Sequence, residues 1–120
     1  MKILIVDDSK AMRMIVARCI RQAGFTGDEI VEAADGVIGL AMFKQHSPQL
    51  VISDWNMPYM NGFEMLQNLK ATHPGLRFGF VTSESTEDMR TLAKHNGAGF
   101  FLTKPIVAAN LKTAIDAVMR

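Results

Sequence analysis

The sequence predicts an α/β fold in which a parallel sheet lies between two layers of helices. Short apolar runs alternate with helical patterns from end to end of the 120 residues, in five successive strand–helix units. This alternation is typical of parallel sheets, because a crossover helix must join each strand to the next. The length fits one domain, which we place at residues 1–120 and expect to carry no output domain.

Five apolar runs predict the strands. The first, Ile3 to Val6, is continuously apolar, as expected for a strand that is covered on both faces. The later strands are predicted by the runs through Ile30 and Val31, Leu50 to Ile52, Phe78 to Val81, and Phe100 to Leu102.

Apolar residues at helical spacing predict the intervening helices. In the first helix this face is formed by Met12, Ile15, Val16, Cys19, Ile20 and Ala23. Ser9 is expected to cap the start of that helix and Gly24 to stop it. Asp35-Gly36 and Asn61-Gly62 open the next two helices, and for the fourth we expect a cap at Ser85 and an end at Gly97. The last helix is predicted to bury the stripe formed by Leu111, Ala114, Ile115 and Val118.

Composition excludes several functional classes. The net charge of +1 gives no general attraction to nucleic acid or to an anionic membrane. No apolar run approaches the roughly 18 residues of a membrane helix, and the N-terminus lacks the features of a signal peptide. Cys19, the only cysteine, is interpreted as a small core residue. We therefore expect a cytoplasmic protein that binds neither nucleic acid nor membrane.

Polar residues follow the predicted strands at one edge of the sheet. Ligands of open α/β sheets bind beyond the carboxyl ends of the strands, so these residues are the candidate site. In chain order, the strands are followed by Asp7-Asp8, Asp54, Thr82 and Lys104-Pro105. Each has an ordinary alternative interpretation, such as helix capping by Asp8 or Ser9, or simple solvation. Their convergence at one edge favours a shared function.

The residue types indicate phosphoryl chemistry assisted by a metal. Crowded carboxylates repel one another and recruit a hard cation such as Mg²⁺, which commonly bridges to phosphate. Lys104 and Thr82 suit a phosphate group, as a point charge and a hydrogen-bond donor. Asp54 can act as the nucleophile that forms an aspartyl-phosphate. Metal and lysine would then neutralise charge on the transferred group.

Five short motifs carry a resemblance to a known family. They are Ile-Val-Asp-Asp-Ser at 5–9, Glu-Ala-Ala-Asp-Gly at 32–36, Ser-Asp-Trp-Asn-Met-Pro at 53–58, Val-Thr-Ser-Glu at 81–84 and Thr-Lys-Pro at 103–105. Together they resemble receiver domains of two-component response regulators over the whole chain, and in particular the single-domain regulators of chemotaxis. The resemblance implies a flavodoxin-like (βα)5 three-layer sandwich with strand order 2-1-3-4-5.

The resemblance also implies roles for individual residues. Asp54 is the expected phosphoacceptor. The expected metal ligands for Mg²⁺, for which Mn²⁺ can substitute, are Asp8, Asp7 largely through water, Asp54 and the backbone carbonyl of Asn56. Thr82 and Lys104 are expected to contact the phosphoryl oxygens, and the bond between Lys104 and Pro105 is expected to be cis.

A switch is implied by the same resemblance. Phosphate draws the Thr82 hydroxyl inward, Phe101 rotates into the vacated space, and the surface of the fourth helix, fifth strand and fifth helix changes. Asn56 and Glu84 are expected to tune dephosphorylation. The expected partners are a sensor histidine kinase, a downstream protein reader such as a flagellar motor switch protein, and a phosphatase. The protein itself is expected to be a monomer.

Four alternatives stay open at this point. The chain could serve in a phosphorelay outside chemotaxis, or it could be a scaffold that is never phosphorylated. A Mg²⁺-dependent phosphohydrolase is disfavoured because Asn56, not a second acid, stands two residues after Asp54. A nucleotide-binding module is disfavoured because neither G-x-G-x-x-G after the first strand nor G-x-x-x-x-G-K-[ST] occurs.

Overall fold

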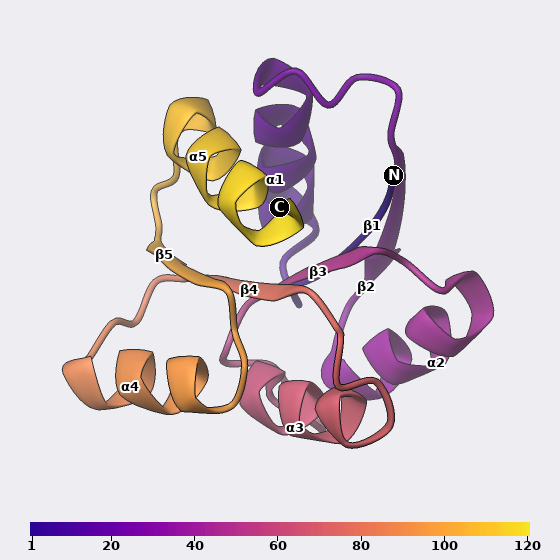
Figure 1. The fold of residues 1–120 in the computed structure, drawn as a ribbon, viewed down its shortest axis with the longest axis vertical. Coiled ribbons are helices and arrows are strands. Elements are labelled where there is room, and N and C mark those ends of the chain that lie inside the picture. The colour runs from indigo at the N-terminus through magenta and orange to yellow at the C-terminus, as the bar shows by residue number, and fades with distance from the viewer.

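A parallel sheet of five strands runs through the centre of the molecule (Figure 1). The computed structural model describes all of residues 1–120. The strands lie in the order β2-β1-β3-β4-β5, which confirms the flavodoxin-like topology and the strand order expected from the resemblance. Their bounds are β1 (Lys2–Val6), β2 (Glu29–Ala33), β3 (Leu50–Ser53), β4 (Phe78–Thr82) and β5 (Phe100–Thr103).

Helices cover both faces of the sheet. Figure 1 shows α1 and α5 on one face of the sheet and α2, α3 and α4 on the opposite face. None of the helices combines the length and the apolar character that crossing a bilayer demands. The helices are α1 (Lys10–Gln22), α2 (Gly36–His46), α3 (Gly62–Thr72), α4 (Glu87–His95) and α5 (Ala108–Met119).

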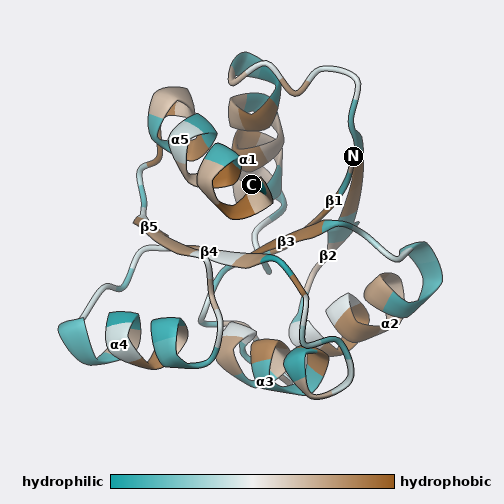
Figure 2. Ribbon diagram, viewed as in Figure 1, coloured by the Kyte–Doolittle hydropathy of each residue, from teal (hydrophilic) through white to brown (hydrophobic).

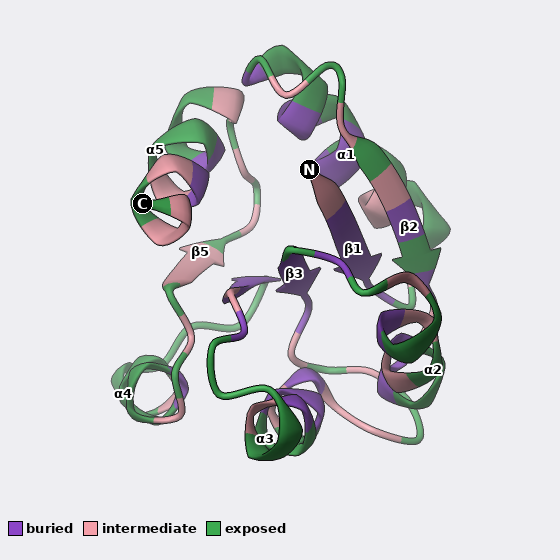
Figure 3. Cartoon of the chain, turned by 45° about the vertical axis from the view of Figure 1, so that its right-hand side comes forward, coloured by how far each residue is buried: buried purple, intermediate pink, exposed green.

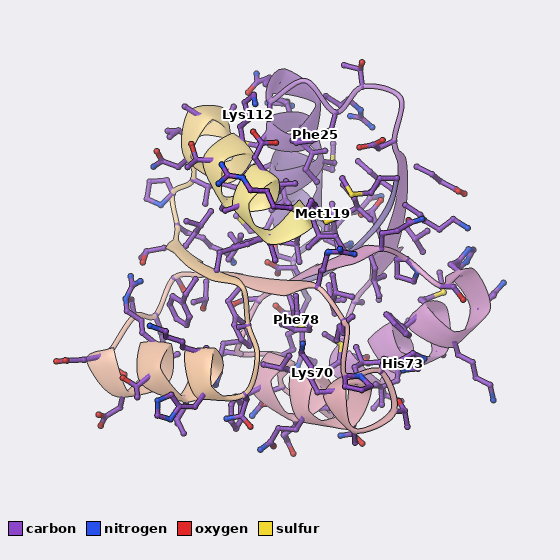
Figure 4. The ribbon with its side chains drawn as sticks, in the orientation of Figure 1. Phe25, Lys70, His73, Phe78, Lys112 and Met119 are labelled. Atoms are coloured by element: carbon purple, nitrogen blue, oxygen red, sulfur yellow. The ribbon has the colours of Figure 1, made fainter.

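The sheet separates two hydrophobic cores, because successive strand side chains point to opposite faces. In β1, Ile3 and Ile5 belong to the core beneath α1 and α5, whereas Leu4 and Val6 belong to the core on the other side. Figure 4 shows Phe78 on the side of α3, and Phe25 and Met119 on the side of α1 and α5. The colouring in Figure 2 shows the apolar character of the central strands against the mixed character of the helices. This double burial explains the continuous apolar runs in the sequence.

Local signals set most helix ends as predicted. Ser9, Asp35 and Asn61 each cap a helix through a side chain that accepts a backbone N–H. Gly24 and Gly97 follow helices with φ of 102° and 94°, a conformation that favours glycine.

Two expectations about the helices were wrong. Thr86, not Ser85, caps α4 by accepting the N–H of Met89, so the helix begins one residue later. The Ser85 hydroxyl instead accepts from Arg90 Nε at 2.8 Å. In α1, Ile15 is 40% exposed, because the helix turns Ala17 rather than Ile15 into the core.

Candidate functional site

The residues after the strands remain fastened to the sheet. The backbone N–H of Asp7 donates to Ala33 at 3.1 Å, and that of Asp54 donates to Val6 at 2.9 Å. Lys104 N–H donates to the carbonyl of Thr82 at 2.8 Å. Strand pairing therefore continues into the candidate site and sets the positions of these residues, which lie far apart in sequence.

Three carboxylates gather at this edge. Asp7, Asp8 and Asp54 each present an oxygen, and these atoms all lie within 4.8 Å of one another. Asp7 is 3% exposed and Asp54 is 8% exposed, whereas Asp8 faces solvent. Mg²⁺ prefers hard oxygen ligands and keeps several of its waters, for which the exposed side of this site leaves room. The acidic cluster therefore fits a Mg²⁺ site.

Lys104 bridges the two buried carboxylates. Its ammonium lies 3.0 Å from Asp7 Oδ2 and 2.9 Å from Asp54 Oδ2. Burial works to lower the pKa of Lys104, but hydrogen bonds and charge attraction from the two carboxylates outweigh it and raise the pKa above its usual value. The lysine is therefore a permanent cation that partly compensates the acidic cluster.

Burial is the main influence on the ionisation of Asp7. Desolvation raises the pKa of Asp7, and repulsion from Asp54 acts in the same direction. The hydrogen bond from Ser9 and the contact with Lys104 lower the pKa but do not reverse the shift. The cause of the pKa shift therefore differs between the two partners. Ion pairing determines its direction at Lys104, and burial determines it at Asp7. A buried carboxylate with incomplete compensation favours the approach of a further cation.

Backbone donors orient the two buried carboxylates. Asp7 Oδ1 accepts the N–H of Ser9 at 2.9 Å, and Asp54 Oδ1 accepts the N–H of Trp55 at 2.7 Å. The other oxygen of each is left to Lys104. Asp8 accepts no hydrogen bond, so its exposed carboxylate is available to an incoming ion.

The first residue of α3, Gly62, packs against the backbone of Asp54, the candidate acceptor. The N–H of Gly62 donates to the carbonyl of Trp55 at 2.8 Å, and the Ser53 hydroxyl donates to the Asp54 carbonyl at 2.7 Å. A Cβ at Gly62 would collide with the Asp54 carbonyl. The sequence predicted Gly62 only as the opening of a helix, because nothing local reveals that the acceptor's backbone lies against it.

Thr82 lies at the edge of the site without joining its polar contacts. Its side chain is buried, and its Oγ1 accepts the N–H of Glu84 at 3.5 Å. Its hydroxyl makes no hydrogen bond to Asp54 or to Lys104. Asn56 and Glu84 are exposed in the loops that follow β3 and β4, and the peptide bond between Lys104 and Pro105 is cis, as the resemblance implied.

An aromatic cluster connects the segment of Asp54, the candidate acceptor, to β5. Trp55 stacks on Phe63 at 5.1 Å between ring centroids and contacts Phe80 at 4.9 Å. Phe101, which is half-buried, lies 6.2 Å from Trp55 and 5.8 Å from Phe80. Residue 55 directly follows Asp54, so a continuous path of packed rings runs from the candidate acceptor to the predicted switch residue.

Two arginines near the site escaped the sequence prediction. Arg13 donates to the carbonyl of Asp7 at 2.6 Å and to Glu32 at 2.9 Å, and so holds the acidic segment against β2. Arg90 lies over the ring of Phe101 at 4.8 Å. Charged residues on exposed helices are usually solvated, so no pattern in the sequence marks these two.

Comparisons with known proteins agree with this geometry. A family model described as the response regulator receiver domain matches residues 3–116. Chemotaxis protein CheY-3 of Vibrio cholerae serotype O1 is 38% identical, covering 98% of this chain and 91% of that protein. The solved structure of CheY4 from Vibrio cholerae is similar with a TM-score of 0.86 at 31% identity, covering 98% of this chain and 97% of that chain.

A further solved structure is the CheX–CheY–BeF3–Mg²⁺ complex from Borrelia burgdorferi. Its matching chain has a TM-score of 0.91 at 25% identity, covering 99% of this chain and 89% of that chain. The likeness therefore extends over essentially the whole chain in both sequence and structure. With the acidic cluster at the carboxyl edge and the topology in view, this chain belongs to the response regulator receiver domain family.

Proposed function

We propose that this receiver domain is a Mg²⁺-dependent phosphoacceptor switch that takes a phosphoryl group from a histidine kinase onto Asp54. The observation that carries the proposal is the position of Lys104, whose ammonium bridges Asp54 at 2.9 Å and Asp7 at 3.0 Å beside the exposed Asp8. A lysine, a carboxylate nucleophile and further acids are the groups that phosphoryl transfer to aspartate requires. The BeF3 and Mg²⁺ in the related CheY complex from Borrelia burgdorferi support the same chemistry.

In the transfer step, a carboxylate oxygen of Asp54 attacks the phosphorus of the phosphohistidine. The new oxygen–phosphorus bond forms as the phosphorus–nitrogen bond breaks, and the departing imidazole keeps the electron pair and takes up a proton. Lys104 moves from Asp54 Oδ2 to a phosphoryl oxygen and stabilises the transferred charge. Asp8, Asp54 and the Asn56 carbonyl would hold Mg²⁺ or Mn²⁺, with Asp7 acting through water, and the bound ion would supply positive charge beside the same group.

Loss of the phosphoryl group follows when water attacks phosphorus and the bond between phosphorus and the Asp54 oxygen breaks, which releases inorganic phosphate and restores the carboxylate. Asn56 and Glu84 stand exposed two residues after Asp54 and Thr82, on two different loops. We assign them to tuning the access of that water, and hence the lifetime of the phosphorylated state. A phosphatase partner would act at the same place.

The signal leaves through movement of Thr82 and Phe101. The Thr82 hydroxyl turns toward the phosphoryl group, and Phe101 follows into the space it leaves, which alters the surface formed by α4, β5 and α5. The CheY relatives support a role in chemotaxis, with a downstream protein such as a flagellar motor switch component as reader. Residues 1–120 then act as one cytoplasmic, monomeric receiver.

The proposal is tested by intact-protein mass after incubation with Mg²⁺ and acetyl phosphate. We expect a gain of one phosphoryl group in the wild type and in Asp116→Asn, a matched change at a carboxylate of α5 that pairs with Lys112. Asp54→Asn, and the wild type in the presence of EDTA, should show no gain. Full phosphorylation of Asp54→Asn would overturn the assignment of the acceptor, and no gain in the wild type would favour the scaffold alternative.

A further inference from the structure

Arg90 makes four contacts that no other residue of α4 makes. Its guanidinium donates to the Phe101 carbonyl at 3.2 Å and to Thr103 Oγ1 at 2.9 Å, both on β5. Its Nε donates to the Ser85 hydroxyl at 2.8 Å, in the loop between β4 and α4. The guanidinium also lies over the Phe101 ring, 4.8 Å from its centroid. One side chain thus joins α4, the β4–α4 loop, β5 and the predicted switch aromatic.

These contacts differ in how they respond to movement. The bonds to the Phe101 carbonyl and to Thr103 involve strand β5, whose backbone is paired with β4 (Phe80 with Phe101, Thr82 with Thr103). Neither bond involves the Phe101 ring, so rotation of that ring leaves both in place. The contacts with the Phe101 ring and with Ser85 exist only while the ring and the loop keep their present positions. The bonds from Arg90 to β5 therefore persist when the Phe101 ring moves. Its contacts with the ring and with Ser85 depend on the positions of the ring and of the β4–α4 loop.

The polar contacts of Arg90 are important for the position of α4, because few apolar side chains of this helix are buried. Helix α4 buries only Ala93, so apolar packing contributes little to holding it against the sheet. The Phe101 ring is half-buried, with Trp55 and Phe80 on its inner side and the guanidinium of Arg90 as its charged contact. A planar guanidinium can stack on a ring and donate in several directions at once, which a lysine ammonium cannot do.

We propose that Arg90 is a positioning residue that latches Phe101 and the β4–α4 loop in the resting arrangement. It thereby sets how much of the unphosphorylated protein adopts the signalling arrangement. The inference rests on the proposed function for its consequence, but its structural part, the hold on Phe101, stands without phosphorylation. A latch of this kind works because Arg90 binds the two arrangements with different free energies.

The direction of the effect follows from the position of Thr82. Its hydroxyl accepts the N–H of Glu84 and makes no hydrogen bond to Asp54, so in the proposed switch this is the resting arrangement. Removal of Arg90 takes away contacts that belong to it and shifts the population toward the signalling arrangement. Loss of one exposed cation–π contact corresponds to about a threefold to fivefold change in that equilibrium. Phosphorylation by a small donor, which the signalling arrangement favours, should accelerate by a similar factor.

The test compares Arg90→Met, Arg90→Lys and Lys94→Met. Lys94 is the matched control, since it is an exposed cation one turn along α4 and makes no side-chain hydrogen bond or ion pair. The first readout is the fluorescence of Trp55, the only tryptophan, together with the NMR signals of the Phe101 ring, in proteins that also carry Asp54→Asn. The second readout is the initial rate of phosphorylation by acetyl phosphate in proteins with Asp54 intact.

We expect Arg90→Met to shift both readouts, Arg90→Lys to shift them less, and Lys94→Met to leave them at the wild-type values. A double-mutant cycle with Phe101→Leu distinguishes the latch from general loosening of α4. In the Phe101→Leu protein the ring is absent, so Arg90→Met should no longer change the phosphorylation rate. Unchanged Phe101 signals in Arg90→Met overturn the latch, even if phosphorylation proceeds normally. Changed Phe101 signals in a protein that never accepts a phosphoryl group support the latch and instead overturn the proposed function.

Discussion

The two halves of the site are held in different ways. On one half, β3 buries all four of its residues and α3 buries Gly62, Met65, Leu66 and Leu69. On the other half, β5 buries none of its residues and α4 buries only Ala93. Figure 3 shows this contrast, with buried strands in the centre and an exposed α4 at the margin. Apolar packing dominates in the first half, whereas the second depends more on the pairing of β5 with β4 and on polar contacts through Arg90.

This difference matches what a switch requires. The proposed acceptor must keep its geometry for transfer, since small displacements of reacting groups slow chemistry strongly. The surface that reports the change must instead be able to move at low cost in free energy, and elements with few buried contacts are the ones that do so. Under the proposed function, the chemistry would therefore take place on β1, β3 and α3, and the signal would leave through α4 and β5.

The largest expected effect compares one leucine from each half. Leu66 of α3 is fully buried, whereas Leu92 of α4 is 47% exposed. We expect Leu66→Ala to lower the free energy of unfolding by about 3 kcal/mol, through lost burial and the cavity that remains. Leu92→Ala should cost less than about 1 kcal/mol. Urea denaturation measures both, and equal losses would remove the contrast between α3 and α4.

A smaller effect is expected where α3 meets the acceptor. In Gly62→Ala the new methyl group meets the Asp54 carbonyl, which strand pairing prevents from yielding. We expect a loss of about 2 kcal/mol in the free energy of unfolding, together with slower phosphorylation of Asp54. Gly27→Ala is the matched control, because nothing lies within 4 Å of its Cβ position. Normal phosphorylation of a stable Gly62→Ala protein would show that the contact does not position Asp54.

Sequence patterns predicted the first half better than the second. Continuous apolar runs mark β1 and β3 because both faces of these strands are buried, and the acids that follow them must then lie at the carboxyl edge. Asp7, Asp8 and Asp54 were found in this way. The strand order did not follow from periodicity and needed the family resemblance.

The outer half carries weaker signals. At the start of α4, Ser85 and Thr86 are adjacent capping residues, and only the structure distinguishes them, because Arg90 occupies the Ser85 hydroxyl. Arg90 itself looks like any exposed cation in the sequence. Its role depends on the folded positions of Phe101 and Thr103, which lie more than ten residues further along the chain. Contacts made by flexible polar side chains leave no periodic pattern, so sequence alone could not predict them.

The smallest expected effect concerns the buried charge in the first half. Burial raises the pKa of Asp7, so the folded protein binds its proton more tightly than the unfolded chain does. Asp7 therefore contributes stability below the ordinary carboxyl pKa, and that contribution is lost as pH rises through its folded pKa. Asp7→Asn keeps an acceptor for the Ser9 N–H and removes the charge, while Lys104 keeps its partner Asp54.

Without a divalent cation, we expect Asp7→Asn to unfold less readily than the wild type at pH 7, by about 1 kcal/mol. The advantage should shrink as the pH falls toward 4, because the wild-type carboxyl then becomes neutral as well. Thermal unfolding across this range, with and without Mg²⁺, measures both effects, and Mg²⁺ should stabilise the wild type more than the variant. A variant that is less stable than the wild type at pH 7 would mean that attraction to Lys104, rather than the cost of burial, dominates at Asp7. Charge pairing as well as apolar packing would then stabilise the first half, and its contrast with α4 would be one of degree.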